Sequence, residues 1–398
     1  MHASRILRSC LAPVLDPMHA ARRKRLLAAV DALASGRRLS LTGLARSWPG
    51  AEWVHAPMKA LDRLLSNAHL QAEVVPLQQA MSTWLLRGDV RPIVLVDWAD
   101  LKRDGNWAVL RASVPIGGRA LTWFEQIFPV ERMGQPKAQS EFLQAFAKIV
   151  PDGIVPILVT DAGFRSEWLQ AVRDRGWDYV GRVRNNTHVL FADDAGWRPC
   201  TSLHAQATFQ ARDLGSCHIV KGNPMPTRLV LARRRSKGRD QLTRSGKPQQ
   251  SKIARKARKS AREPWLLATS LDATTHTAHA VVQAYSRRMQ IEEAFRDLKS
   301  HRYGVGFEDS LTRKPERLTI LLLLNSLASL AAWLMGLAAA EQVHSDPLTR
   351  QAKHRSRYSL IRRGFEWLRR LELPPEITQM LNVRSLRPLA LATLGRGG

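Results

Sequence analysis

Four side chains that can bind phosphate or metal recur at helical spacing in the last third of the sequence: Tyr285, Arg288, Glu292 and Lys299. At about 100° per residue, their positions fall within a stripe roughly 60° wide on one continuous helix. Such a face would present a phenol, a guanidinium, a carboxylate and an ammonium together. A solvated helix surface with pairs of opposite charge has the same pattern, and the stripe alone favours that interpretation.

Two aspartates follow short apolar runs that are typical of buried strands. Residues 92–96 (PIVLV) precede Asp97, and residues 154–160 (IVPILVT) precede Asp161. We expect each aspartate at the carboxyl end of its strand, where two such ends can bring carboxylates together at one sheet edge. Trp98, next to the first aspartate, is expected to pack in the core.

These segments together resemble the DDE transposases of the insertion sequence four family, in its YREK branch. The stripe has the Y-(2)-R-(3)-E-(6)-K spacing of that branch, and MQIEEAFRDLKS completes it. Further matching segments occur in order between about residues 20 and 340: KALDRLLSN, IVLVDWADL, LVTDAGF, GWDYVGRVR and REPWLLATSL. Within the family, the chain is most similar to the transposon-ten type.

The resemblance implies an α/β fold with an RNase H-like core interrupted by a strand-rich insertion. It assigns the catalytic and metal-binding carboxylates to Asp97, Asp161 and Glu292. The 131 residues between Asp161 and Glu292 leave room for the insertion. The expected domains are a helical DNA-binding domain (1–88), a first core part (89–183), the insertion (184–271), a second core part (272–342) and a basic helical tail (343–398).

The resemblance also implies the reaction, which is cut-and-paste transposition of an insertion sequence. Strand cleavage by water, hairpin formation and strand transfer are all displacements at phosphorus, and Mg²⁺ is the expected ion, with Mn²⁺ as a substitute. Arg288, Lys299 and Tyr285 would contact phosphates of the transposon end. Trp265 would stack on a flipped base, although a buried core tryptophan explains that residue about equally well.

The charge of the chain points to a polyanionic partner. Lys and Arg number 61 against 34 Asp and Glu, a net charge of +27. Such a surface attracts nucleic acid, because neutralised phosphates release counterions; an anionic membrane is the second alternative. We expect double-stranded DNA, both transposon ends and target, and a homodimer assembled on two ends. No GxxxxGK[ST] loop predicts a nucleotide cofactor.

The first 88 residues have the pattern of short helices. Apolar residues of 26–33 share one face and Gly36 ends that helix; further helices are expected from about Thr42 and after Pro57. His55, Lys59 and Arg63 form a basic stripe if the last helix extends back to residue 55. Helix-turn-helix DNA binding and an ordinary helical bundle explain this segment equally well.

The remaining elements alternate and then change character. Residues 92–183 predict the order β-β-β-α-β-α-β, and 184–271 hold short strand-like pieces around a basic loop at 233–262 that contacts DNA or is simply flexible. Residues 272–300 predict one long helix with Asp272 as its N-cap. Residues 358–370 predict an amphipathic helix with arginines on its outer face.

Cysteine use and hydropathy limit the cellular setting. Cys10, Cys200 and Cys217 form no CxxC pair, so a disulfide framework and structural zinc are disfavoured. The N-terminus has no continuous apolar segment of the secretory type. Residues 318–340 are long enough for a membrane span, but we expect a buried core helix and no membrane. A bacterial cytoplasmic, nucleoid-associated protein is predicted.

Three alternatives remain. One is a site-specific RNase H-like nuclease that never joins strands. Another is a catalytically silent, transposase-derived DNA-binding protein, which would be expected to have lost a carboxylate. The last is a protein anchored in a membrane by residues 318–340.

Overall fold

The computed structural model describes residues 2–86, 90–102, 105–234, 249–252, 254–255, 263–341 and 358–395. The chain divides into two compact units. Unit 1 comprises Met1–Pro156 and Met289–Gly398, and unit 2 comprises Ile157–Arg288. The domain boundaries expected from the sequence remain predictions.

Unit 1 begins with helices, as expected: α1 (His2–Leu15), α2 (Ala20–Gly36), α3 (Leu41–Arg46), α4 (His55–Leu65) and α5 (Ala68–Leu86). Ser40 caps α3 by accepting a hydrogen bond from the Gly43 amide at 3.2 Å. Helix α4 does extend back to residue 55. His55, Lys59 and Arg63 are therefore exposed on one helix, and the predicted basic stripe is present.

An antiparallel sheet follows, with strands in the order β3 (Ala120–Pro129), β2 (Trp107–Pro115) and β1 (Ile93–Asp100). Gly117 and Gly118 form the turn between β2 and β3, with φ of 83° and 89°. The prediction that β1 ends at Asp97 is wrong. Pairing with β2 continues through Asp100, because Trp98 and Ala99 match apolar partners on β2 and extend the ladder.

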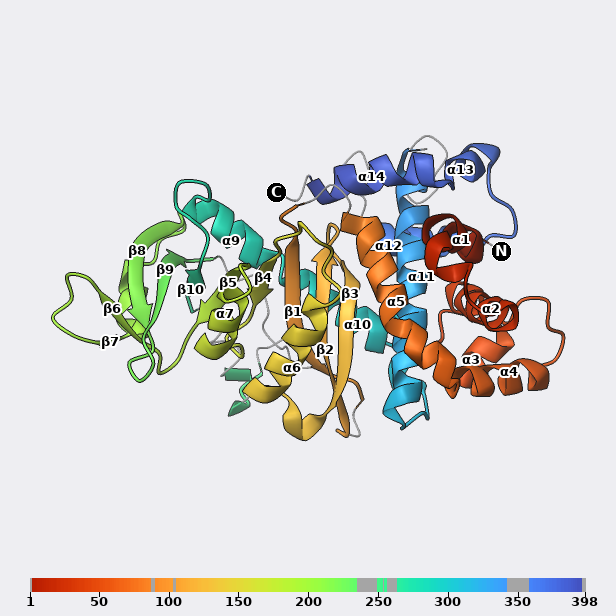
Figure 1. The fold of residues 1–398 in the computed structure, drawn as a ribbon, viewed down its shortest axis with the longest axis horizontal. Coiled ribbons are helices and arrows are strands. Elements are labelled where there is room, and N and C mark those ends of the chain that lie inside the picture. The colour runs from red at the N-terminus through yellow and green to blue at the C-terminus, as the bar shows by residue number, and fades with distance from the viewer. Residues whose placement is uncertain are drawn as a thin grey trace. The chain divides into compact units, whose positions relative to one another are not determined.

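The two faces of this sheet are covered by different helices (Figure 1). On one face, α6 (Pro136–Ala147) packs Phe142 and Phe146 against Phe124, and Phe146 also meets Trp123 edge-on. A register shift between Ala112 and Ser113 lets the adjacent Trp123 and Phe124 both contact α6. The other face lies under α10 (Met289–Lys299) and α11 (Pro315–Glu341).

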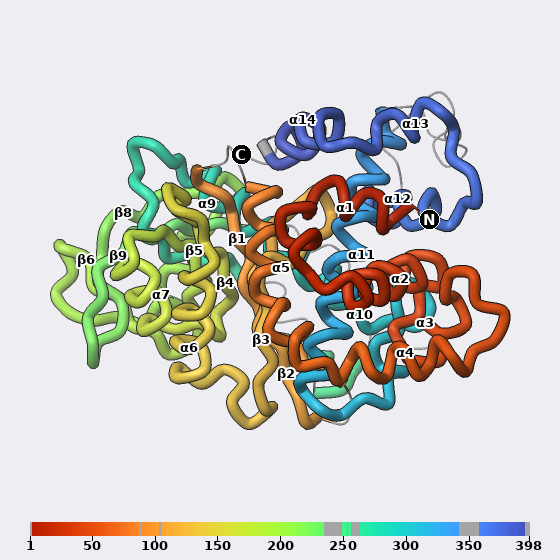
Figure 2. The backbone as a smooth tube through the Cα atoms, turned by 45° about the vertical axis from the view of Figure 1, so that its right-hand side comes forward, coloured from red at the N-terminus to blue at the C-terminus, as the bar shows by residue number. Residues whose placement is uncertain are grey.

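Helix α11 is the core of unit 1. It is the one described helix long and apolar enough to cross a membrane, but 89% of its most apolar window is buried inside the protein. It packs against β3 and the surrounding helices α1, α2, α4, α5 and α12 (Figure 2). The expected core helix is confirmed, and burial on all sides explains why its sequence shows no polar face.

The carboxyl-terminal tail is helical, as expected: α12 (Leu360–Leu368), α13 (Pro375–Met380) and α14 (Val383–Gly395). Ser359 caps α12 by accepting from the Arg362 amide. The prediction that its arginines all face outward is wrong for Arg363, which is 5% exposed. Helix α12 packs tightly on α11, so the arginine nearest that contact is buried.

Unit 2 has a mixed sheet. Strands β4 (Ile157–Thr160) and β5 (Asp178–Val183) are parallel and are joined by α7 (Ser166–Arg173). Antiparallel strands then follow in the order β10 (Trp265–Thr269), β9 (Met225–Ala232), β8 (Arg212–Ile219), β6 (His188–Phe191) and β7 (Arg198–Pro199). The strand-rich character of 184–271 is confirmed, whereas most of the basic loop 233–262 lies outside the described residues.

Candidate active site

Asp97 lies in the middle of β1, on a face rich in charged groups. It stands directly opposite Arg111 on β2, and Arg111 stands opposite Glu125 on β3. Directly opposed residues point to the same face of a sheet. Arg111 forms a buried ion pair with Glu125 at 2.6 Å, and Ser326 of α11 donates to the same carboxylate. Asp97 Oδ1 accepts a hydrogen bond from the Trp98 amide at 2.9 Å.

Helix α10 packs on this same face. The guanidinium of Arg111 lies 4.6 Å from the centre of the Phe295 ring, which anchors α10 above β2. Ile291, Phe295 and Leu298 are its buried residues. Glu292 comes three residues before Phe295, about 60° away around the helix axis, so it lies beside the buried stripe. Asp97 and Glu292 thus come from elements that pack directly against each other in unit 1.

Lys299 lies two turns after Glu292 on the same face of α10. Burial lowers the pKa of Lys299, while Asp100 and Glu308 act to raise it. The neighbouring carboxylates stabilise the charged form of Lys299 less than burial destabilises it. A phosphate bound to the ammonium would supply the missing stabilisation. This part of the predicted stripe is present in the structure.

Asp161 directly follows β4 in unit 2, as expected from the sequence. Its Oδ1 accepts a hydrogen bond from the Gly163 amide at 2.8 Å, which closes a tight turn toward α7. The neighbouring Phe164 is buried and meets Trp168 edge-on. The turn therefore holds Asp161 at the carboxyl end of a buried strand.

Tyr285 and Trp265 meet in unit 2. Their rings are perpendicular, with centroids 4.8 Å apart, and Tyr285 is only 3% exposed. Burial raises the pKa of Tyr285; Arg288 and Arg182 act to lower it, and Asp161 acts to raise it. Trp265 is half-buried, and the Arg234 guanidinium lies 4.8 Å from its ring centre. The structure thus brings the phenol, two guanidinium groups and the second aspartate into one neighbourhood.

The single long helix predicted for 272–300 is wrong. Helix α9 (Ala278–Ser286) ends before Arg287, and α10 begins at Met289. The Arg287 and Arg288 amides donate to carbonyls three residues back, and this tightened turn ends α9. Thr277 caps α9, whereas Asp272 binds Thr274 in a turn of its own. Tyr285 and Arg288 therefore belong to unit 2, and Glu292 and Lys299 to unit 1.

A basic groove of about 590 Å³ opens beside Asp161 in unit 2. It is lined by Arg165, Arg182, Arg184, His188 and Lys221, with Glu167 as a lining carboxylate. Arg184 also pairs with Glu263 nearby. The groove thus carries a net positive charge.

Strained backbone borders the same groove. Asn185 has φ of 60° and Val220 has φ of 66°. Positive φ is rare for a β-branched residue, and backbone strain of this kind clusters at functional sites. The Val220 amide donates to the His188 carbonyl at 2.9 Å, which helps to hold this conformation.

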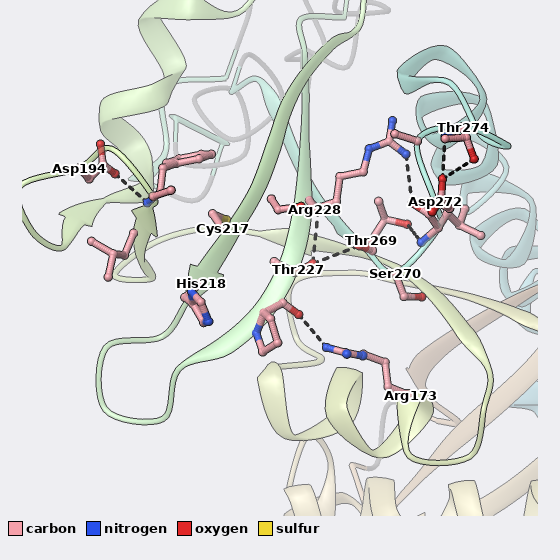
Figure 3. Close-up of a pocket in the computed structure, with 17 residues that line it drawn as sticks. Arg173, Asp194, Cys217, His218, Thr227, Arg228, Thr269, Ser270, Asp272 and Thr274 are labelled. Atoms are coloured by element: carbon pink, nitrogen blue, oxygen red, sulfur yellow. Dashed lines mark hydrogen bonds between the residues drawn. The ribbon is translucent and has the colours of Figure 1, made fainter.

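A larger cavity of about 850 Å³ lies elsewhere in unit 2 (Figure 3). Its polar groups form hydrogen bonds that link elements of unit 2. Arg228 donates to Asp213 and to the Leu271 and His276 carbonyls, and Arg173 donates to the Pro226 carbonyl. None of the three predicted carboxylates lines this cavity.

The expected metal site has carboxylate donors only, Asp97, Asp161 and Glu292. Within the described residues, no group of three or more His, Cys, Asp and Glu side chains is placed to hold a metal ion. The predicted ligands are nevertheless all carboxylates, which are the hard oxygen donors that Mg²⁺ prefers. Asp97 and Glu292 occupy packed elements of one unit, so the donor set fits Mg²⁺ by its chemistry.

Sequence reasoning assigned no role to several residues near these sites. Arg182 contacts the Tyr285 hydroxyl, and Asp100 lies close enough to influence Lys299. Both occur in segments already noted, GWDYVGRVR and IVLVDWADL. The available signal was the spacing of two residues between Arg182 on β5 and Arg184 just after it, because residues two apart on an extended chain lie on the same side. Trp98 packs edge-on against Phe128, as expected.

One comparison with known protein families agrees with the sequence motifs. Residues 137–331 match the family described as Transposase DDE domain. No curated protein matches. Among solved structures, the chain resembles a cryo-EM structure of the piggyBac transposase synaptic complex with hairpin DNA. Identity is 12% and the TM-score is 0.41, over 100% of this chain and 82% of that chain. The segment containing Asp161 and Glu292 is therefore similar to a transposase DDE domain.

Proposed function

We propose that this chain is a cut-and-paste DNA transposase of the YREK branch of the insertion sequence four family. The observation that carries the proposal is the transposase DDE domain match over 137–331, a segment that holds Asp161 and the whole Tyr285–Lys299 signature. Asp97 precedes that segment on β1, in an RNase H-like arrangement inferred from the resemblance. Within the branch, the quoted motifs favour the transposon-ten type.

Asp97, Asp161 and Glu292 are proposed as the catalytic carboxylates and as the ligands of Mg²⁺, which Mn²⁺ can replace. Bound divalent metal supplies charge neutralisation at the phosphorus and activation of the attacking oxygen. The protein side chains supply its position: the Gly163 amide orients Asp161, and the packing of Phe295 on Arg111 fixes the helix that carries Glu292.

Phosphate binding is assigned to cationic groups of both units. Lys299 of unit 1 is half-buried on the Glu292 side of α10, and Arg288 and Tyr285 of unit 2 contact each other. A guanidinium and a phenol that already interact are pre-organised to bind one phosphate between them. The groove of Arg165, Arg182, Arg184 and Lys221 would hold the DNA backbone next to Asp161.

DNA recognition is assigned to other parts of the chain. The exposed stripe of His55, Lys59 and Arg63 on α4 is a candidate contact with the double-stranded transposon end. Trp265 is half-buried, and its ring contacts the ring of Tyr285. A flipped base stacked on Trp265 would therefore extend an existing aromatic cluster.

In the proposed reaction, water cuts one strand at each end, and the freed 3′-hydroxyl attacks the opposite strand to form a hairpin. The hairpin is opened, and the same 3′-hydroxyl joins to target DNA. Each step exchanges one phosphodiester oxygen for another, so one set of carboxylates serves all of them. Action on two ends calls for a homodimer on DNA, in the bacterial cytoplasm and associated with the nucleoid.

The alternative is a catalytically silent, transposase-derived DNA-binding protein, and a nuclease without joining activity is a further rival. A strand-transfer assay separates these alternatives. The purified chain, pre-cleaved transposon-end DNA, supercoiled plasmid and Mg²⁺ are incubated together, and joined products are sought on agarose gels. Joined plasmid supports the transposase. Cleavage of uncut ends without joining would indicate the nuclease, and binding without either reaction would indicate the silent protein.

A further inference from the structure

A further cavity, of about 550 Å³, lies within unit 1 beside α10. Ala294, Arg296, Asp297 and Leu298 line it from α10, and all of these except Arg296 point away from Glu292. Its other walls come from the β2–β3 hairpin, α11 and α12. The volume is within the range of small-molecule sites.

Polar groups of α11 face this cavity. Asn325 and Ser329 lie one turn apart on a largely apolar helix, and both line the cavity. Polar side chains cost free energy inside a core unless they have partners. Their position at the cavity wall accounts for the polar interruption of an apolar sequence and gives a ligand hydrogen-bonding groups.

Positive charge is in excess on the α12 side of the cavity. Glu366 is shared by Arg37 at 3.7 Å, Arg362 at 3.3 Å and Arg369 at 3.7 Å. One carboxylate therefore faces three guanidinium groups. Arg37 and Arg362 both line the cavity, and both donate to the Tyr303 carbonyl.

The opposite side of the cavity does not reduce this excess. Arg119 pairs with Asp297 and lies 3.8 Å from Glu293, and Arg296 pairs with Glu293. These two arginines and two carboxylates balance. The two sides together leave five guanidinium groups against three carboxylates, an excess of two positive charges.

Arg37 is held at this cavity at a conformational cost. It follows α2 with φ of 51°, a left-handed conformation that favours glycine. Its Nε is buried without a hydrogen-bond partner among the described residues. Burial, and then Arg362, lowers its pKa to about 10. An anion in the cavity would satisfy this guanidinium and reverse that shift.

Two aromatic rings flank the cationic groups. Tyr303 and Tyr358 line the cavity and are 58% and 52% exposed, while Phe365 lies deeper and packs on Arg37. Exposed tyrosines beside arginines provide a flat stacking surface next to an anion site, which is the combination that binds nucleotides.

We propose that this cavity is a nucleotide-binding site, with the phosphate held by Arg37 and Arg362, the base against Tyr303 and Tyr358, and Asn325 as a hydrogen-bonding partner. The nucleotide can be free or part of a DNA strand, because both present the same phosphate and ring. The site goes beyond the proposed function and does not depend on it, since it needs no strand cleavage.

Equilibrium dialysis of the full chain with radiolabelled deoxyadenosine 5′-monophosphate tests the proposal. Saturable binding is expected, and unlabelled deoxyadenosine should compete at least about tenfold less well than the monophosphate, because it lacks the charged group. Binding should weaken about tenfold in Arg362→Gln and in Asn325→Leu, a substitution that matches the apolar surroundings of α11. Arg132→Gln removes an arginine outside the cavity and should stay within twofold of wild type.

A short single-stranded DNA then identifies the source of the nucleotide. Displacement of the radiolabel by octathymidylate indicates a DNA strand, and no displacement indicates a free nucleotide. The proposal is overturned if the monophosphate does not bind saturably, if deoxyadenosine competes equally well, or if Arg362→Gln binds within twofold of wild type. Arg362 is partly exposed, so this variant decides the outcome even if Asn325→Leu fails to fold.

Discussion

The indole of Trp265 and the phenol of Tyr285 meet edge-on in unit 2, with ring centroids 4.8 Å apart and planes at 77°. One comes from β10 and the other from α9, and both were singled out from the sequence as DNA contacts. The contact buries Tyr285 almost completely and leaves Trp265 half-buried. A base that stacks on Trp265 would thus rest on a ring already held in place.

Trp265→Ala should separate the steps of the proposed reaction. Loss of base stacking costs about 1–3 kcal/mol, so hairpin formation should slow by roughly ten- to a hundredfold while the first nick keeps its rate. Denaturing gels of time courses measure both products. Trp265→Phe should recover part of the hairpin rate; equal slowing of nick and hairpin would indicate a packing role only.

Lys299→Ala should weaken the complex with transposon-end DNA by about tenfold, the expected loss for a charge-assisted hydrogen bond to phosphate. Gel-shift titrations against end DNA and random DNA measure the difference. Lys148→Ala removes an exposed lysine from the same unit and serves as the control. If Lys299→Ala weakens both DNAs equally, Lys299 is an ordinary surface cation.

Tyr179 should make the fold sensitive to alkali. Burial raises its pKa to about 12, and its hydroxyl donates to Thr227 at 2.9 Å. The hydroxyl of Tyr179 has a higher pKa in the folded state than in the unfolded chain. Its contribution to the free energy of unfolding is therefore fully present below about pH 10 and is lost as pH rises through 12. Melting temperatures between pH 8 and 11.5 should therefore fall more steeply for wild type than for Tyr179→Phe. Parallel curves would contradict this.

Gly364→Ala should destabilise unit 1. A Cβ at Gly364 would lie 1.6 Å from the Ala332 carbonyl oxygen, where α12 crosses α11. The contacting atom belongs to the backbone and cannot move aside as a flexible side chain can. The free energy of unfolding should therefore fall by about 2–3 kcal/mol through overpacking. Urea denaturation compares this variant with Gly196→Ala, which has no atom within 4 Å of its added Cβ. Equal midpoints would mean that the two helices can separate freely.

The sequence predicted the elements whose patterns are local. Helix α11 is largely apolar because most of its surface is buried, and α4 shows its basic stripe because charge recurs every four residues. The resemblance added Asp97, which the periodicity placed at the end of a strand. The structure extends that strand to Asp100, because the partner residues lie on β2 and cannot be read from β1 alone.

The break in the signature helix could not be predicted from local pattern. Neither Gly nor Pro occurs near Arg287 and Arg288, and continuous helical periodicity runs across the break. The tightened turn there coincides with the point at which the chain passes from unit 2 to unit 1. Burial of Arg363 escaped prediction for a similar reason, since it depends on the contact between α12 and α11 rather than on the sequence of α12.

The central claim is tested most directly by cleavage of a short linear DNA that carries a candidate transposon end, with Mg²⁺. Wild type, Glu292→Gln and Glu316→Gln are compared on a denaturing gel; Glu316 is an exposed glutamate of unit 1 and serves as the matched control. Nicked and hairpin products are expected from wild type and from Glu316→Gln, and none from Glu292→Gln, which should still bind the end. Cleavage by Glu292→Gln at a rate near that of wild type would contradict the assignment of the third carboxylate.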